Sequence, residues 1–139
     1  MKRSPTASPA VNKWLVTITI MIGTLIAIID TSIVNVAIPK IQAGFSASID
    51  QVSAVATFYI ISNIIVMPLT GYLSALLGRK QFYAGAIVLF TLASLLCGLA
   101  WNLESLVLFR IIQGLAGGAL FPSAQAILLE TFPKEEHGQ

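Results

Sequence analysis

The sequence predicts an all-α membrane protein with four transmembrane helices. The chain of 139 residues is 56% hydrophobic and only 10% charged, whereas charged residues make up about a quarter of a typical soluble domain. The charged residues also leave four long apolar intervals, and a membrane span needs about 20 mostly apolar residues. None of the intervals alternates strictly between apolar and polar residues, as a barrel strand does. We expect spans at about residues 14–38, 52–77, 82–101 and 106–129.

The first span follows a polar segment, residues 1–13, which we expect to be a disordered cytoplasmic tail. Basic residues before an apolar run are typical of a secretory signal peptide, but the apolar core of such a peptide has only about 7 to 15 residues. A retained helix is therefore expected. Residues 14–139 should form one membrane domain, with outer connections at 39–51 and 102–105 and an inner connection at 78–81. Short connections make successive helices antiparallel neighbours.

The basic residues predict the orientation. With the amino terminus inside the cell, six of the eight Lys and Arg residues lie in inner segments, and Lys40 is the single basic residue of the outer ones. Cytoplasmic loops carry such an excess of basic residues. We expect a multi-pass protein of the plasma membrane, the inner membrane in a bacterium, with both termini cytoplasmic. A net charge of +2 is too weak to indicate a nucleic-acid partner, so the expected partner is the lipid bilayer.

The sequence offers no enzyme, cofactor or metal site. Cys97 is the single cysteine, so neither a disulfide framework nor a cysteine metal site can be built. His137, the single histidine, stands beside Glu135 and Glu136 in a charged segment, where we expect it to be exposed to solvent and not to bind a metal. We therefore predict that the protein is not an enzyme.

Two ionisable residues, Asp30 and Arg110, fall within predicted spans. Insertion of such a residue near the membrane centre costs about 2.5 to 3.5 kcal/mol, which demands an explanation. At 1.5 Å per residue, Asp30 lies about 13 Å below Pro39 and Arg110 about 6 Å below the start of its span. The protonation of a buried carboxylate responds to burial and to a nearby cation, as proton-coupled exchange requires. The alternatives are a polar packing anchor for Asp30 and snorkelling to the outer interface for Arg110.

Prolines and glycines predict bends and close packing. Pro68 and Pro122 lie inside the second and fourth spans, where each removes a backbone hydrogen bond. The fourth span also contains Gly114, Gly117 and Gly118. Gly114 and Gly118 form a G-x-x-x-G pair that lets two helix backbones approach closely. For the glycines alone, static packing is the better interpretation.

Three segments carry family motifs. Residues 29–39 contain an Asp-Thr pair followed by Asn-x-Ala-x-Pro, residues 71–80 read G-Y-L-S-A-L-L-G-R-K, and residues 108–118 read L-F-R-I-I-Q-G-L-A-G-G. Together they resemble the major facilitator superfamily, and specifically its 14-span drug:proton antiporter branch of the EmrB/QacA type. The resemblance covers residues 14–139. The family's loop motif has an acidic and a basic residue where this chain has Ala75 and Leu76, so that charge contact cannot be carried over.

The resemblance implies the fold and function of a proton-driven efflux transporter that exports hydrophobic, often cationic, drugs by alternating access. The fold would be the amino-terminal part of the family's helix bundle, with the proton gradient as energy source and no cofactor. The family's antiporter motif lies in a fifth helix, so the chain would be about the first third of a longer protein. Its partners would be the remaining transporter helices. Some relatives also work with a periplasmic adaptor and an outer-membrane channel.

The resemblance also assigns roles to residues. Proton coupling falls to Asp30 and Arg110, and polar contacts in or near the central cavity fall to Thr31, Asn35 and Gln113. The cytoplasmic gate loop and the close packing of the fourth helix fall to Gly71, Gly78, Arg79, Lys80, Gly114, Gly117 and Gly118.

Two other functions stay open from the residues alone. One is a complete small four-helix multidrug exporter that works as an oligomer, although such proteins tend toward balanced charge when they insert both ways. The other is a non-transporting assembly or regulatory subunit of a membrane complex.

Overall fold

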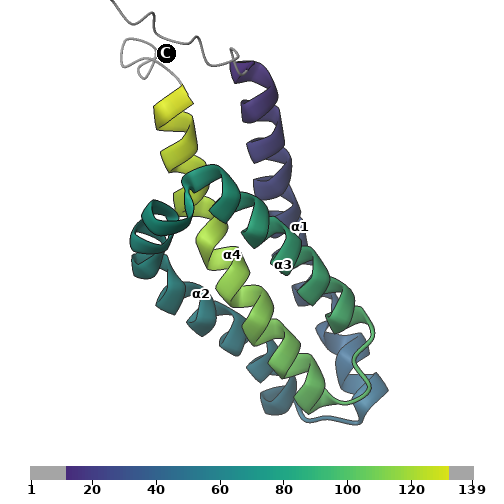
Figure 1. The fold of residues 1–139 in the computed structure, drawn as a ribbon. Helices are drawn as coiled ribbons and strands as arrows, with labels where there is room; N and C mark the ends of the chain where they lie inside the picture. Colours follow the sequence, from purple (N-terminus) through teal and green to yellow (C-terminus); the bar gives the residue numbers. More distant parts are fainter. Residues whose placement is uncertain (1–11, 132–139) are drawn as a thin grey trace, which may run out of the picture.

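The computed structural model describes residues 12–131, which form four α-helices joined by short connections (Figure 1). The helices are α1 (Lys13–Phe45), α2 (Ile49–Leu77), α3 (Arg79–Gly98) and α4 (Leu103–Thr131). All four are long and apolar enough to cross a membrane. The predicted fold class is therefore confirmed. Most of the predicted tail and the segment around His137 lie outside the described residues.

The helices run antiparallel, so that α1 begins and α4 ends at the same end of the bundle (Figure 1). We call this the tail end; it also carries Gly78, between α2 and α3. The opposite end, which carries the connections 46–48 and 99–102, is called the loop end. An even number of antiparallel helices leaves both ends of the described chain on one side.

Helix α1 is longer than the predicted span at its carboxyl end. We expected an outer connection from Pro39 to Gln51, but the helix continues through Pro39 to Phe45. A proline removes one backbone hydrogen bond and bends a helix without necessarily ending it. The end is made by Ser46, whose φ of 52° is left-handed and whose backbone N–H donates to the carbonyl of Gln42. At the other end, Lys13 belongs to the helix and not to the tail.

Helix α2 begins with a capping box, in which Ser48 and Gln51 each bond the other's backbone N–H. At its other end the chain reverses within one residue, since Gly78 has a φ of 85°, a conformation open to glycine. The predicted inner connection at 78–81 is thus reduced to Gly78, and Arg79 already begins α3. Gly71 likewise lies inside α2. The segment expected to form a gate loop is therefore almost entirely helical.

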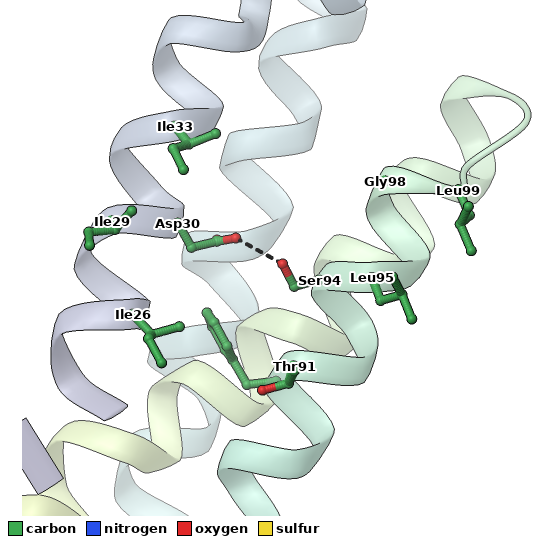
Figure 2. A pocket seen from close by; sticks show the side chains of 10 residues that line it. Ile26, Ile29, Asp30, Ile33, Thr91, Ser94, Leu95, Gly98 and Leu99 are labelled. Carbon is green, nitrogen blue, oxygen red and sulfur yellow. Dashed lines mark hydrogen bonds between the residues drawn. The ribbon is translucent and has the colours of Figure 1, made fainter. Parts of the chain in front are cut away.

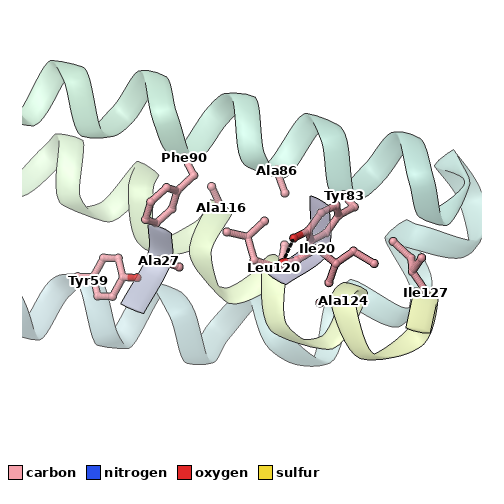
Figure 3. Close-up of a cluster of buried hydrophobic side chains, with 11 residues drawn as sticks. Ile20, Ala27, Tyr59, Tyr83, Ala86, Phe90, Ala116, Leu120, Ala124 and Ile127 are labelled. Atoms are coloured by element: carbon pink, nitrogen blue, oxygen red, sulfur yellow. Dashed lines mark hydrogen bonds between the residues drawn. The ribbon is translucent and has the colours of Figure 1, made fainter. Parts of the chain in front are cut away.

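Helix α4 is the centre of the bundle. In its most apolar stretch 56% of the residues are buried, against 17% in α1 and 22% in α2 and α3. It packs mainly against α2 and α3, and less closely against α1. The core runs along α4 from Tyr59 and Phe90 at one end to Ile127 at the other (Figure 3). The outward face of α1 is left rich in exposed Ile, Leu and Met side chains.

Glycine lets α4 touch the backbone of α2. A Cβ atom built on Gly114 would stand 2.5 Å from the carbonyl oxygen of Tyr59, and one on Gly118 would collide with the carbonyl oxygen of Asn63. Both α4 residues and their α2 partners are four positions apart, so successive helical turns meet in register. Pro122 follows one turn after Gly118 inside α4, and Pro68 lies inside α2. The bends expected at these prolines stay predictions.

Candidate functional site

The two ionisable residues of the spans meet as an ion pair between α1 and α4. Arg110 Nη1 donates a hydrogen bond of 2.8 Å to Oδ2 of Asp30. The Arg110 side chain is 3% exposed and that of Asp30 is 16% exposed. Arg110 therefore extends toward Asp30 and does not snorkel to the end of its helix. A buried pair of this kind is costly to break, because either partner alone would be an uncompensated charge.

Gln113 joins the two charges through its side-chain amide. Its Oε1 accepts a hydrogen bond of 2.6 Å from Arg110 Nη1, and its Nε2 donates one of 2.8 Å to Oδ1 of Asp30. Gln113 stands three residues after Arg110, so both side chains leave the same face of α4. Its exposed fraction is 0%. The amide thus closes a hydrogen-bonded network with Asp30 and Arg110, and this network fixes the orientation of both charged groups.

The other two helices also contribute side chains to the group around the Asp30–Arg110 pair, which we call the centre. From α3, the hydroxyl of Ser94 donates to Oδ1 of Asp30 at 3.4 Å, and the thiol of Cys97 donates to Oε1 of Gln113 at 3.6 Å. From α2, the ring of Tyr59 lies under the Arg110 guanidinium, with 4.2 Å between Cζ and the ring centroid. Among residues 12–131, Arg110 Nε finds no hydrogen-bond partner. Side chains from all four helices therefore surround the pair.

A cavity of about 630 Å³ opens beside Asp30 between α1 and α3 (Figure 2). Its wall is mostly apolar, with Ile26, Ile29 and Ile33 from α1 and Phe90 and Leu95 from α3. The polar side chains at this wall are Asp30, Thr91 and Ser94. A carboxylate at the edge of an apolar cavity can release its proton, or attract a cationic ligand, while its other oxygen is held by Arg110.

Depth along the helices differs from the sequence estimate. Because α1 continues to Phe45, Asp30 lies about 22 Å from the loop end of its helix, and Arg110 lies about 10 Å from Leu103. Both residues are thus farther from their helix ends than the predicted spans implied. This depth places the ion pair well inside the bundle.

Two of the predicted cavity residues, Thr31 and Asn35, do not line the cavity beside Asp30. Thr31 is exposed, and its hydroxyl donates to the carbonyl of Ala27 in its own helix at 3.1 Å. Asn35 is also exposed, and neither residue lines the cavity beside Asp30. Positions 31 and 35 are rotated by about 100° and 140° from position 30 around a helix of 3.6 residues per turn. Their predicted contact with substrate stays a prediction.

Sequence reasoning missed Tyr59, Ser94 and Cys97. One signal was available for the last two: they are three residues apart and share a face of α3, and this face is the one turned toward α1 and α4. Tyr59 gave no comparable signal, since aromatic residues are common in apolar spans. Only the packing of α2 against α4 brings its ring to Arg110.

A second ion pair lies at the tail end. Arg79 Nη1 contacts Oε1 of Glu130 at 2.6 Å and donates to the carbonyl of Ala126 at 3.4 Å. The two side chains are 42% and 59% exposed. Glu130 was missed from the sequence, where it is only the first residue after the predicted fourth span. This contact ties the start of α3 to the last turn of α4, and Lys80 is exposed beside it.

Comparison with known proteins agrees with the motifs. Residues 20–139 match the family model of the Major Facilitator Superfamily. The chain is 40% identical over 126 residues to the colistin resistance protein EmrB of Acinetobacter baumannii, covering 91% of this chain and 25% of that protein. It is 36% identical over 135 residues to the probable multidrug resistance protein EmrY of Escherichia coli K12, covering 97% and 26%.

A third relative is the fatty acid resistance protein FarB of Neisseria gonorrhoeae, 37% identical over 129 residues and covering 93% of this chain and 25% of FarB. The chain thus spans about a quarter of the length of these relatives. The region matched by the family model, residues 20–139, contains Asp30, Arg110 and the glycines of α4. This multi-pass membrane chain therefore belongs to the major facilitator superfamily.

Proposed function

We propose that this chain is the amino-terminal part of a proton-coupled multidrug efflux transporter that works by alternating access. Asp30 binds and releases the coupling proton, and Arg110 sets how readily it does so. The observation that carries the proposal is the Asp30–Arg110 pair, buried between α1 and α4 at the wall of a cavity. An intramembrane ionisable pair is expensive, and pairs of this kind mark ion pathways and proton relays.

The proposed substrates are hydrophobic compounds, often cationic. The apolar wall of the cavity provides the surface for a hydrophobic body, and Asp30 provides a negative charge for a cation. The relatives' names support the hydrophobic part of this proposal, with two resistance proteins for drugs and one for fatty acids. Transporters of this superfamily place their sites between repeat-related parts, so the remaining helices would complete the pathway. No enzymatic step is needed.

The proposed location is the plasma membrane, the inner membrane in a bacterium, with the tail end on the cytoplasmic side. The tail end carries Lys13, Arg79 and Lys80, whereas Lys40 lies near the loop end. This distribution supports the orientation, because cytoplasmic segments are enriched in Lys and Arg. A periplasmic adaptor and an outer-membrane channel are proposed partners of the complete protein, by analogy with the family branch.

The test is Asp30→Asn in the complete protein, reconstituted in proteoliposomes. The amide has almost the shape of the carboxyl group but cannot bind and release a proton at this site. With ethidium as the probe, we expect transport driven by a proton gradient to be lost, while ethidium binding in the absence of a gradient survives at least in part. Proton release on adding ethidium should disappear as well.

Asp50→Asn is the matched control, because Asp50 is an exposed carboxylate in the first turn of α2. It should leave gradient-driven transport unchanged. Proton-coupled transport at the wild-type rate in Asp30→Asn would overturn the proposal. Loss of transport in both variants would show that the assay reports folding or insertion, and circular dichroism of the reconstituted protein separates that result.

A further inference from the structure

Besides the amide oxygen of Gln113, the Arg110 guanidinium has two partners that differ in kind. One is the carboxylate of Asp30 at 2.8 Å, and the other is the face of the Tyr59 ring, whose centroid is 4.2 Å from Cζ. Tyr59 is 6% exposed and Arg110 is 2% exposed. A cation over an aromatic face is attracted by the negative face of the ring, and more strongly when both are removed from water. The ring is therefore a real electrostatic partner here.

The two partners respond oppositely to protonation of Asp30. In the ionised pair, Arg110 is held by the carboxylate and by the ring together. When Asp30 takes up a proton, its pull on Arg110 weakens and the guanidinium can settle more closely on the ring. The ring thus stabilises the protonated state of the centre more than the ionised state. Without it, protonation would leave a buried guanidinium with only neutral oxygen acceptors, those of Gln113 and of the protonated Asp30 carboxyl group.

We propose that Tyr59 is a positioning residue that holds the Arg110 charge while Asp30 is protonated. The inference rests on the proposed function, since it concerns the proton carried by Asp30, and it assigns a role to a residue of α2. The ring provides a favourable contact for the Arg110 guanidinium in the part of the proton cycle in which Asp30 is protonated. Tyr59 does not itself carry the proton.

The surroundings of Asp30 bear on its titration from every helix packed against it. Arg110 faces it from α4 and Tyr59 from α2, while Cys97 of α3 acts through Gln113 and Ser94 adds a hydroxyl. Of these groups, Arg110 is the one that carries a full charge opposite to the carboxylate. The electrostatics of this centre therefore depend mainly on how strongly Arg110 interacts with Asp30 and how strongly it interacts with the Tyr59 ring.

A glycine of α4 leaves space for the Tyr59 side chain. A Cβ atom built on Gly117 would stand 2.9 Å from the Tyr59 hydroxyl oxygen. Arg110 and Gly117 are seven residues apart, which puts them on the same face of α4 at a distance of two turns. One face of α4 therefore carries both the charge that the ring attracts and the gap that receives its hydroxyl end.

The test compares variants of similar shape in the complete protein in lipid nanodiscs. Tyr59→Phe keeps the negative ring face, whereas Tyr59→pentafluorophenylalanine keeps the size of the ring and reverses its quadrupole. Infrared spectroscopy follows the carbonyl stretch of the protonated Asp30 carboxyl group as the pH is varied, with the band assigned by its absence in Asp30→Asn. No transport and no substrate are needed for this readout.

We expect the pH midpoint of the Asp30 band to be lower in the fluorinated variant than in Tyr59→Phe, because only the Phe ring attracts the guanidinium. Tyr59→Leu, which removes the ring, should shift it in the same direction. Phe58→Leu is the packing control, since Phe58 is the exposed neighbour on α2, and it should leave the midpoint unchanged.

Equal midpoints in the fluorinated and Phe variants would overturn the role of the ring and leave the proposed function standing. A shift in Tyr59→Phe as large as in Tyr59→Leu would also overturn it, because the hydroxyl and not the ring face would then be responsible. If wild-type protein shows no Asp30 band that titrates, both the role of Tyr59 and the proton role of Asp30 fail together.

Discussion

The chain contains two Arg–carboxylate pairs of similar length in very different surroundings. The Asp30–Arg110 pair is 2.8 Å long with side chains 16% and 3% exposed, and the Arg79–Glu130 pair is 2.6 Å long with side chains 59% exposed for Glu130 and 42% for Arg79. The first is surrounded by side chains from all four helices, whereas the second lies at the open tail end. Contact distance alone therefore says little about what an ion pair does.

The two ion pairs differ in energy mainly because one is buried and the other is exposed. In a low-dielectric interior the two charges attract strongly, but each has lost its hydration, so that neither can be left alone. Near water, screening and side-chain entropy reduce an ion pair to a small contribution. A change in the charge of either partner of the buried pair should therefore affect the stability of the whole bundle. The exposed pair should contribute only slightly to the packing of α3 against α4.

Asp30→Ala should have the largest effect on stability. It leaves the Arg110 charge buried without its carboxylate, and breaking a buried pair in this way costs about 3 to 5 kcal/mol. The measurement is the free energy of unfolding of the complete protein in mixed detergent and dodecyl sulfate micelles. The double variant Asp30→Ala with Arg110→Leu removes both charges and should recover most of the loss. A double variant as unstable as the single one would show that the pair is not held by mutual charge compensation.

Gly114→Ala tests whether the centre depends on the close contact between α2 and α4. The added Cβ would meet the carbonyl oxygen of Tyr59, so the helices must separate, at an expected cost of about 1 to 3 kcal/mol. The same unfolding assay measures it. Gly71→Ala is the matched control, because nothing stands within 4 Å of a Cβ at that position of α2. It should be neutral or slightly stabilising, since alanine favours helix more than glycine. Equal losses in both variants would contradict the close contact.

Gln113→Leu should lower the free energy of unfolding by about 1 to 3 kcal/mol, because it removes a buried amide that bonds both charges. Gln113→Glu is the sharper comparison. It keeps the shape but places a second carboxylate beside Asp30, so we expect a new pH dependence of unfolding that Gln113→Leu lacks. Identical behaviour of the two variants across pH would show that Gln113 acts by filling space alone.

How far the sequence predicts the molecule follows from the same contrast. The four helices, Asp30 and Arg110 are predictable because a charge in an apolar run is conspicuous and expensive. The exact ends of the helices are not, since the sequence predicts an outer connection from residue 39 although the helix continues to Phe45. Tyr59 and Ser94 are ordinary residues of a span, and only the packing of α2, α3 and α4 brings them to the ion pair. Glu130 escaped notice because its partner is 51 positions away in the chain and the pair forms only through the bundle.

The smallest expected effect belongs to the tail end. A double-mutant cycle with Arg79→Ala and Glu130→Ala in the complete protein should give a coupling free energy of about 0.2 to 1 kcal/mol, and added salt should reduce it further. The hydrogen bond from Arg79 to the carbonyl of Ala126 does not depend on Glu130, so Arg79→Ala should cost more than Glu130→Ala. A coupling near that of the buried pair, insensitive to salt, would mean that the remaining helices cover this end and bury the pair. The contrast between the two pairs would then hold only for the helices described, and the tail end would itself become a candidate for a structural latch.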